Sequence, residues 1–257
     1  MNKKIHLVTG LVLGLGALQA VSAAGFDARV EWAKRVAMSV PVSGVVQTVE
    51  VDTGQAIKKG QMLLQLEQTP FITGLAAAKA ARTRAAGDRR EAQRDLAQTR
   101  ELYERGLISN NELEDAELKV KRANAGWNAA AAQVERAQYD LGHSRLRAPF
   151  DGWVLGRNVQ AGQSIISTQQ AQTLLVLAAA DEYVARAEIP GKKLASLKMG
   201  DRAVVEVGGK SYKGIVSVLG LEPLTGRKGD DKYYEVAVAF NSAGQLLRAG
   251  QEAEINF

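Results

Sequence analysis

Two short stretches decide how this chain folds: Pro41-Val42-Ser43-Gly44-Val45-Val46 and Pro149-Phe150-Asp151-Gly152-Trp153-Val154. The second stretch follows the first at an offset of 108 residues, and further matches continue at that same offset. They pair Val51 with Val159, Gly54-Gln55 with Gly162-Gln163, Ile57 with Ile165, and Leu66 with Leu174. A fixed offset indicates an internal repeat. The chain therefore contains two copies of one structural unit.

Each copy has the pattern of small antiparallel strands. Short β-branched or apolar runs, such as Val45 to Val51 and Met62 to Leu66, alternate with glycines that suit tight turns. One copy of about 30 residues cannot bury its apolar face alone. Two copies packed face to face can form a small flattened barrel or sandwich, so we expect the halves to fold together.

The residues between the two copies favour a helical hairpin. The segment is rich in Ala, Arg, Glu and Gln, and Thr69-Pro70 suits an N-cap followed by proline in the first turn. In the first arm, Arg82 and Arg89 interrupt the apolar positions, and we expect their stems to pack while their charged heads reach water. The second arm shows unbroken 3-4 spacing, typical of a coiled-coil seam, at Leu113, Ala116, Val120, Ala123, Trp127, Ala130, Val134, Ala137 and Leu141.

A turn is predicted between the two arms. Gly106 suits a left-handed residue that ends the first helix, and Ser109 with Glu112 forms the S-x-x-E pattern of a capping box that starts the second. At 1.5 Å per residue, each arm of 32 to 36 residues extends roughly 50 Å. An arm of that length buries little against its own domain, which favours a partner at the tip.

The start of the chain reads as a secretory signal. Lys3 and Lys4 precede a mostly apolar run, and Val21-Ser22-Ala23 offers small residues for cleavage. We therefore expect a mature protein that is soluble in the periplasm. Loss of the two lysines would lower the formal net charge from +5 to +3, too little to favour nucleic acid as a partner.

Composition argues against conventional catalysis. The chain has no cysteine, and its two histidines are His6 in the leader and His143. Thiol chemistry and zinc–cysteine clusters are excluded, and any histidine-based triad or metal site would depend on His143 alone. We predict a protein that is not an enzyme, with no catalytic residues, cofactor or metal.

The last third of the chain alternates apolar and polar residues in several short runs, among them Ala203 to Val207 and Tyr234 to Val238. Short strands at such spacing suggest a small β-barrel. Phe26, Ala28, Val30 and Trp32 also alternate, so we expect residues 24–39 to add a strand to this barrel.

The split repeat resembles the biotinyl/lipoyl domain and, more closely, its divided form in periplasmic adaptor proteins, the membrane fusion or HlyD-type family. The resemblance depends on Val42 to Val46 with Gly54 to Gln61, and on Leu146 to Gly152 with Gly162-Gln163. It implies a mixed α and β fold, with a coiled-coil hairpin inserted in a split lipoyl-like domain and followed by a small β-barrel. The expected boundaries are 1–23 signal peptide, 24–39 N-terminal strand, 40–68 first lipoyl half, 69–142 hairpin, 143–178 second lipoyl half and 179–257 barrel.

The resemblance also implies residues for partner contact. Adaptors dock through a tip motif of Arg, then Leu four residues on, then Ser seven further. Leu102 and Ser109 match this spacing, while Gln98 stands at the Arg position and Arg100 lies two residues away. Leu107 and Ile108 are apolar residues at an otherwise exposed turn. The candidate partner-binding residues are Arg100, Leu102, Arg105, Leu107, Ile108 and Ser109.

The function implied is that of an adaptor subunit in a tripartite efflux or export pump. It would link an inner-membrane transporter, of the resistance-nodulation-division type, to an outer-membrane channel, as a homo-oligomer or with another adaptor. The chain is most like the adaptors of that pump type, but the membrane-proximal domain that they usually carry after the barrel is not expected before Phe257.

Two alternatives use the same fold. One is a biotinyl or lipoyl carrier, although Lys58 and Lys59 lie inside the first half rather than in a turn that joins the halves. The other is a periplasmic scaffold or metal chaperone that works without an exporter.

Overall fold

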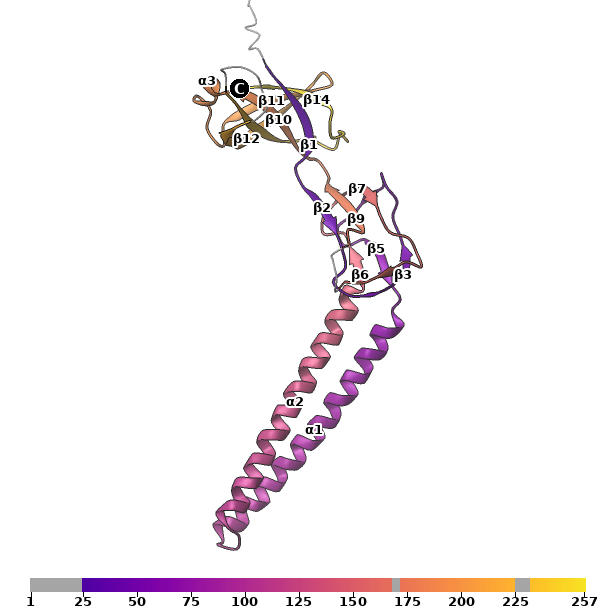
Figure 1. Ribbon diagram of the computed structural model, residues 1–257, viewed down its shortest axis with the longest axis vertical. Helices are drawn as coiled ribbons and strands as arrows, with labels where there is room; N and C mark the ends of the chain where they lie inside the picture. Colours follow the sequence, from indigo (N-terminus) through magenta and orange to yellow (C-terminus); the bar gives the residue numbers. More distant parts are fainter. Residues whose placement is uncertain (1–24, 168–171, 225–231) are drawn as a thin grey trace, which may run out of the picture. The chain divides into compact units, whose positions relative to one another are not determined.

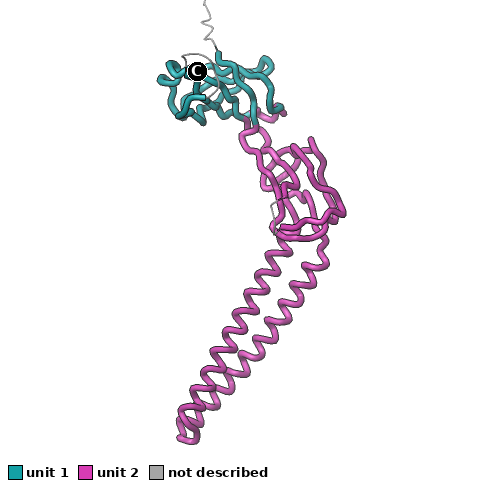
Figure 2. The backbone as a smooth tube through the Cα atoms, in the orientation of Figure 1, with its two compact units in different colours: residues 1–31, 184–241, 248–257 teal, residues 32–183, 242–247 magenta. Residues whose placement is uncertain are grey.

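The computed structural model describes residues 25–167, 172–224 and 232–257, so the expected signal peptide lies outside the described residues. The chain forms two compact units, each described by itself below (Figure 2). The larger unit comprises residues 32–183 and 242–247 and contains a β-sandwich and the helical hairpin. The smaller unit comprises residues 25–31, 184–241 and 248–257 and forms a barrel. This confirms the expected mixed fold, in which a helical hairpin interrupts one β domain and a barrel forms the other.

The sandwich consists of two four-stranded sheets (Figure 1). One sheet has the order β2 (Arg35–Met38), β9 (Leu175–Ala179), β7 (Gly152–Arg157) and β4 (Ala56–Ile57). The other has the order β6 (Arg145–Arg147), β5 (Met62–Leu66), β3 (Gly44–Val49) and β8 (Ser164–Ile165). Both sheets therefore contain strands from both copies of the repeat.

The two copies exchange strands reciprocally. Gly44 of β3 pairs with Ile165 of β8, and Gly152 of β7 pairs with Ile57 of β4. Gly152 lies 108 residues after Gly44, and Ile57 lies 108 residues before Ile165, so the second pair repeats the first with the two copies exchanged. Each copy thus lends a two-residue strand to the other copy's sheet. Without this strand from the other copy, the edge of each sheet would leave backbone N–H and C=O groups unpaired. Neither copy can therefore complete its own sheet.

The repeated apolar positions form the core of the sandwich. Val46 and Val154 are each 1% exposed, and both Leu66 and Leu174 are fully buried. The other predicted pairs, Val51 with Val159 and Ile57 with Ile165, are buried as well. Burying one such side chain contributes about 1.5 to 3 kcal/mol, so the core depends on equal contributions from both copies.

Five described turns share one geometry. In each, the third residue is a glycine with φ between 82° and 90°. The fourth residue donates its N–H to the carbonyl of the first, and its side chain accepts the N–H of the first. A positive φ at this position favours glycine. The turns are Asp52–Gln55, Lys58–Gln61, Gln160–Gln163, Lys198–Asp201 and Arg248–Gln251.

The hairpin consists of α1 (Thr69–Glu104) and α2 (Asn110–His143), which pack along each other. All nine apolar positions of the predicted α2 seam are buried or half-buried, with Ala116 and Val134 the most enclosed. Within residues 25–167, 172–224 and 232–257, no helix is both long and apolar enough to cross a membrane.

Of the two arginines that interrupt the apolar positions of α1, Arg89 differs from expectation. Arg82 is exposed, but the guanidinium of Arg89 lies over the ring of Trp127, 4.2 Å from its centroid. The Arg89 Nε is buried, and no described group accepts its hydrogen. Its charged head is therefore held in the seam, because the face of the indole attracts the cation.

The hairpin root also differs in detail. Gln68, rather than Thr69, occupies the N-cap of α1, and its side chain makes no capping hydrogen bond. Its Nε2 instead donates to the Leu66 carbonyl at 3.0 Å and to the buried Ser144 Oγ at 2.8 Å. This contact ties the start of α1 to the end of α2.

The smaller unit is a closed barrel of six strands. Their order is β1 (Phe26–Trp32), β10 (Glu182–Pro190), β13 (Tyr233–Asn241), β12 (Lys210–Pro223), β11 (Arg202–Val207) and β14 (Glu252–Asn256). A short helix, α3 (Gly191–Leu194), follows β10. Side chains at alternate positions, such as Val30, Ile189, Val205, Val238 and Ile255, fill the barrel.

The boundaries between the units differ from the expected ranges. Arg35–Met38, expected to join the barrel, instead forms β2 and pairs with β9 of the sandwich. Residues 242–247 also group with the larger unit, because Tyr183 Oη donates to the Leu247 carbonyl and accepts the Leu247 N–H. In both cases, hydrogen bonds between segments distant in the sequence determine which unit the residues join.

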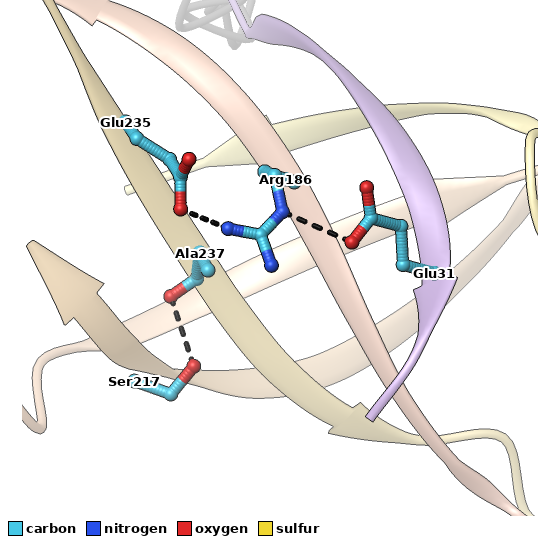
Figure 3. A network of polar contacts seen from close by, with 5 residues as sticks. All are labelled: Glu31, Arg186, Ser217, Glu235 and Ala237. Carbon is cyan, nitrogen blue, oxygen red and sulfur yellow. Dashed lines mark hydrogen bonds and ion pairs between the residues drawn. The ribbon is translucent and has the colours of Figure 1, made fainter. Parts of the chain in front are cut away.

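A polar network lies on the wall of the barrel (Figure 3). The Arg186 guanidinium joins Glu31 on β1, at 3.0 Å, to Glu235 on β13. Ser217 Oγ donates to the Ala237 carbonyl nearby, at 3.2 Å. These contacts link four neighbouring strands of the closed sheet and help to set their register.

The repeat supplies a matched pair of mutations. A Cβ at Gly152 would lie 2.0 Å from the Ala178 carbonyl oxygen, whereas a Cβ at Gly44 would meet the Leu66 Cδ1 at 3.2 Å. We expect Gly152→Ala to lower the free energy of unfolding by about 2 to 4 kcal/mol and Gly44→Ala to change it by less than about 1 kcal/mol. Chemical denaturation followed by circular dichroism measures both. Equal losses would contradict the close approach of the backbones at Gly152.

A second prediction concerns the seam. Arg89→Leu removes a buried donor that lacks a described partner and restores an apolar seam position, at the cost of the contact with Trp127. We expect the hairpin to gain about 1 kcal/mol, because an unsatisfied buried group costs about 1 to 3 kcal/mol and the cation–π contact contributes about 0.5 to 2 kcal/mol. Arg82→Leu at the exposed position is the control. A lower melting temperature for Arg89→Leu would show that the cation–π contact outweighs the unsatisfied Nε.

Candidate partner interface at the hairpin tip

The end of α1 forms a Schellman motif. The Leu107 N–H donates to the Leu102 carbonyl at 3.0 Å, and the Gly106 N–H donates to the Tyr103 carbonyl at 2.8 Å. Gly106 has φ of 69°, which glycine adopts without strain. The motif reverses the chain within three residues and brings Leu107 back toward Leu102, an apolar pairing that commonly accompanies this turn.

The start of α2 forms the predicted capping box. Ser109 Oγ accepts the Glu112 N–H, and the Glu112 carboxylate accepts the Ser109 N–H at 2.8 Å. The Ser109 hydroxyl also donates to this carboxylate at 2.9 Å. The hydrogen bond from the Ser109 backbone, followed by the one from its side chain, lowers the pKa of the Glu112 carboxyl because both favour its charged form.

The tip presents apolar side chains to solvent. Leu107 is 66% exposed and Leu102 is 41% exposed, while Ile108 is half-buried. Tyr103 and Leu118, which sequence reasoning missed, are exposed to a similar degree as Leu102. The apolar residue two positions before the helix end and the one just after Gly106 are the sequence signal of a Schellman motif, so Leu102 and Leu107 each have a local structural role as well.

The two candidate arginines are engaged within the hairpin. Arg100 makes an ion pair with Glu117 of α2, at 3.3 Å, and Arg105 makes one with Glu101. The structure thus brings the six candidate residues to one end of the hairpin, but it gives both guanidinium groups intramolecular acidic partners. Both pairs are exposed, so each contributes little stability and a partner could compete for them.

Other sequence candidates lie away from the tip. Lys58 and Lys59 belong to the turn that ends at Gln61, where Lys58 Nζ is 3.9 Å from the Asp151 carboxylate and the Lys59 N–H donates to it. Across the part of the chain that the structure describes, no three His, Asp or Glu side chains are grouped as metal ligands would be.

The capping box gives a pH prediction. Because its pKa is lowered, the Glu112 carboxylate stabilises the start of α2 above the ordinary pKa of glutamate, and this contribution is lost as pH falls through the lowered value. We expect Ser109→Ala to raise the pKa of Glu112 toward the ordinary range, measured by NMR titration of the side-chain carboxyl. An unchanged pKa of Glu112 in Ser109→Ala would contradict the role of the hydroxyl.

Comparisons with known proteins agree with this architecture. The family described as the CzcB-like, barrel-sandwich hybrid domain matches residues 34–177, more than half of the chain. The macrolide export protein MacA of Yersinia pestis is 25% identical over 87% of this chain and 64% of its own length. The multidrug resistance protein MdtA of Photorhabdus laumondii is 27% identical over 69% of this chain and 41% of its own length. The chain thus spans less than two thirds of either relative.

Among solved structures, the membrane fusion protein Spr0693 of Streptococcus pneumoniae R6 shares the fold with a TM-score of 0.70. The two are 16% identical, and the match covers 91% of this chain and 97% of that one. The family match covers both copies of the repeat and the whole hairpin inserted between them. The chain therefore belongs to the family of CzcB-like barrel-sandwich hybrid domains, as its resemblance to the periplasmic adaptor, or membrane fusion, proteins predicted.

Proposed function

We propose that this protein is a non-enzymatic periplasmic adaptor that links an inner-membrane transporter to an outer-membrane channel in an efflux or export pump. The observation that carries this proposal is the hairpin. It leaves the sandwich as two paired helices of 36 and 34 residues and ends in a turn with exposed apolar side chains. A long paired hairpin of this kind suits contact with a distant protein rather than catalysis.

The mechanism is mechanical. At 1.5 Å per residue the arms extend roughly 50 Å, and the seam between them buries Ala116 and Val134 of α2 and partly buries apolar side chains of α1. The hairpin is therefore stabilised by its own pairing, and its tip is available for a partner. The candidate contact residues at the tip are Arg100, Leu102, Arg105, Leu107, Ile108 and Ser109.

The names of the relatives support a role in efflux or export. MacA is named for macrolide export and MdtA for multidrug resistance. From the resemblance to the adaptor family, we further propose a transporter of the resistance-nodulation-division type, and several copies of this chain, or this chain with another adaptor, assembled side by side around a conduit. Residues 1–23 would direct the chain to the periplasm and be removed.

Site-specific crosslinking tests the docking role. The chain has no native cysteine, so a single thiol can be placed at the tip by Leu107→Cys. In cells that carry the natural partners, we expect a thiol-reactive crosslinker to trap an outer-membrane channel protein, identified by mass spectrometry. The matched control is Gln133→Cys, an exposed position on the stem of α2, which we expect to trap no channel. Capture of this chain alone at the tip would contradict channel docking.

A further inference from the structure

Charge is segregated along the hairpin. Residues 95–118, which form the tip half, contain seven carboxylates and two arginines. Residues 69–94 and 119–143, which form the stem half, contain ten lysines and arginines and four carboxylates. The tip half is thus net negative and the stem half net positive, although the hairpin as a whole is nearly neutral. Like charges gathered on exposed helices repel one another, so this arrangement does not serve the stability of the hairpin.

Most carboxylates at the tip have structural partners. Glu112 caps α2 through Ser109, and Glu114 accepts a hydrogen bond from Asn110 at 2.6 Å. Glu101 and Glu117 pair with Arg105 and Arg100, respectively. These contacts use both arginines of the tip half, so no excess cation is left there.

Among the described residues, no side-chain hydrogen bond or ion pair involves the other three carboxylates of the tip half, those of Asp95, Glu104 and Asp115, and of these only Glu104 lies at the end of a helix. It is the last residue of α1, it is exposed, and within the described residues no donor or cation lies within bonding distance of its carboxylate. A helix C-terminus carries partial negative charge, so a carboxylate at this position is unfavourable. The last turn of α1 contains no basic residue that would offset it, and Arg105 at the C-cap pairs with Glu101 instead. The free protein therefore loses stability by having Glu104 here.

Glu104 is separated by only two residues from the most exposed apolar residue of the tip. Leu107 follows it by three residues, across the Schellman turn. An apolar side chain at the centre of a contact with a charge at its edge is the usual composition of a protein interface. A partner surface that complements these two side chains would therefore have an apolar pocket for Leu107 and a cation at the rim of that pocket for Glu104.

We propose that the hairpin tip recognises a protein partner that presents lysine or arginine beside an apolar pocket, and that Glu104 pairs with this cation while Leu107 enters the pocket. This inference rests on the proposed function and names the chemistry of its docking partner. The partner's cations would offset the net negative charge of the tip half, and electrostatic attraction would speed the encounter.

The test measures stability and capture in the same variants of the full chain. The thiol is placed at exposed Asn111, which leaves Leu107 intact, and Glu104 is changed to Gln or Lys. We expect Glu104→Lys to raise the melting temperature, because a cation suits the helix C-terminus, and to lower the yield of the crosslinked channel by about tenfold. Glu104→Gln should shift both in the same directions by less. In the Asn111→Cys variant that keeps Glu104, the yield of the crosslinked channel should fall as the salt concentration rises.

The matched control is Glu91→Lys, the same charge change at an exposed position in the stem part of α1. We expect it to leave capture unchanged and not to raise the melting temperature. Capture that is equal with Glu or Lys at position 104 would overturn this inference and leave the docking role intact. If Asn111→Cys traps no outer-membrane protein, the proposed function fails. If it traps only the positive stem of another copy, the partner assigned here is wrong.

Discussion

The reciprocal pairing of two distant β segments is the constraint on which the rest of the larger unit depends. Gly44 pairs with Ile165 and Gly152 with Ile57, so each copy of the repeat supplies the short strand that completes the other copy's sheet. The buried positions are divided equally between the copies. The sandwich can therefore form only when segments 95 and 121 residues apart meet, and the entropy of closing so long a loop is offset by one shared core.

The hairpin follows from this pairing. Strands β5 and β6, which precede α1 and follow α2, pair in antiparallel fashion through Gln65 and Arg145. The helices consequently start side by side, and Gln68 and Ser144 hold them there. The paired hairpin brings the end of α2 back to the start of α1, so the two copies lie close in space although many residues separate them along the chain. The same geometry gives the protein its reach.

The tip shows how far reasoning from neighbouring residues extends to the candidate partner interface. Ser109, Glu112 and Gly106 were assignable because a capping box and a left-handed C′ residue are defined by neighbours a few positions away. The ion pair of Arg100 with Glu117 was not, because it depends on which turn of α2 faces the end of α1. As a result, the cations expected to meet a partner are already paired, and the carboxylate of Glu104 stands out instead.

The sequence by itself determined the repeat, the glycine turns, the seam of α2 and the hairpin between the copies. Each of these depends on spacing along the chain: a fixed offset, a period of 3.5 residues, or a four-residue turn. Only the tertiary structure decided that strands are exchanged, that Arg35–Met38 joins the sandwich, and that Arg89 lies over Trp127. The physical reason is that hydrogen bonds and contacts between distant segments depend on their positions in space, which local propensity does not specify.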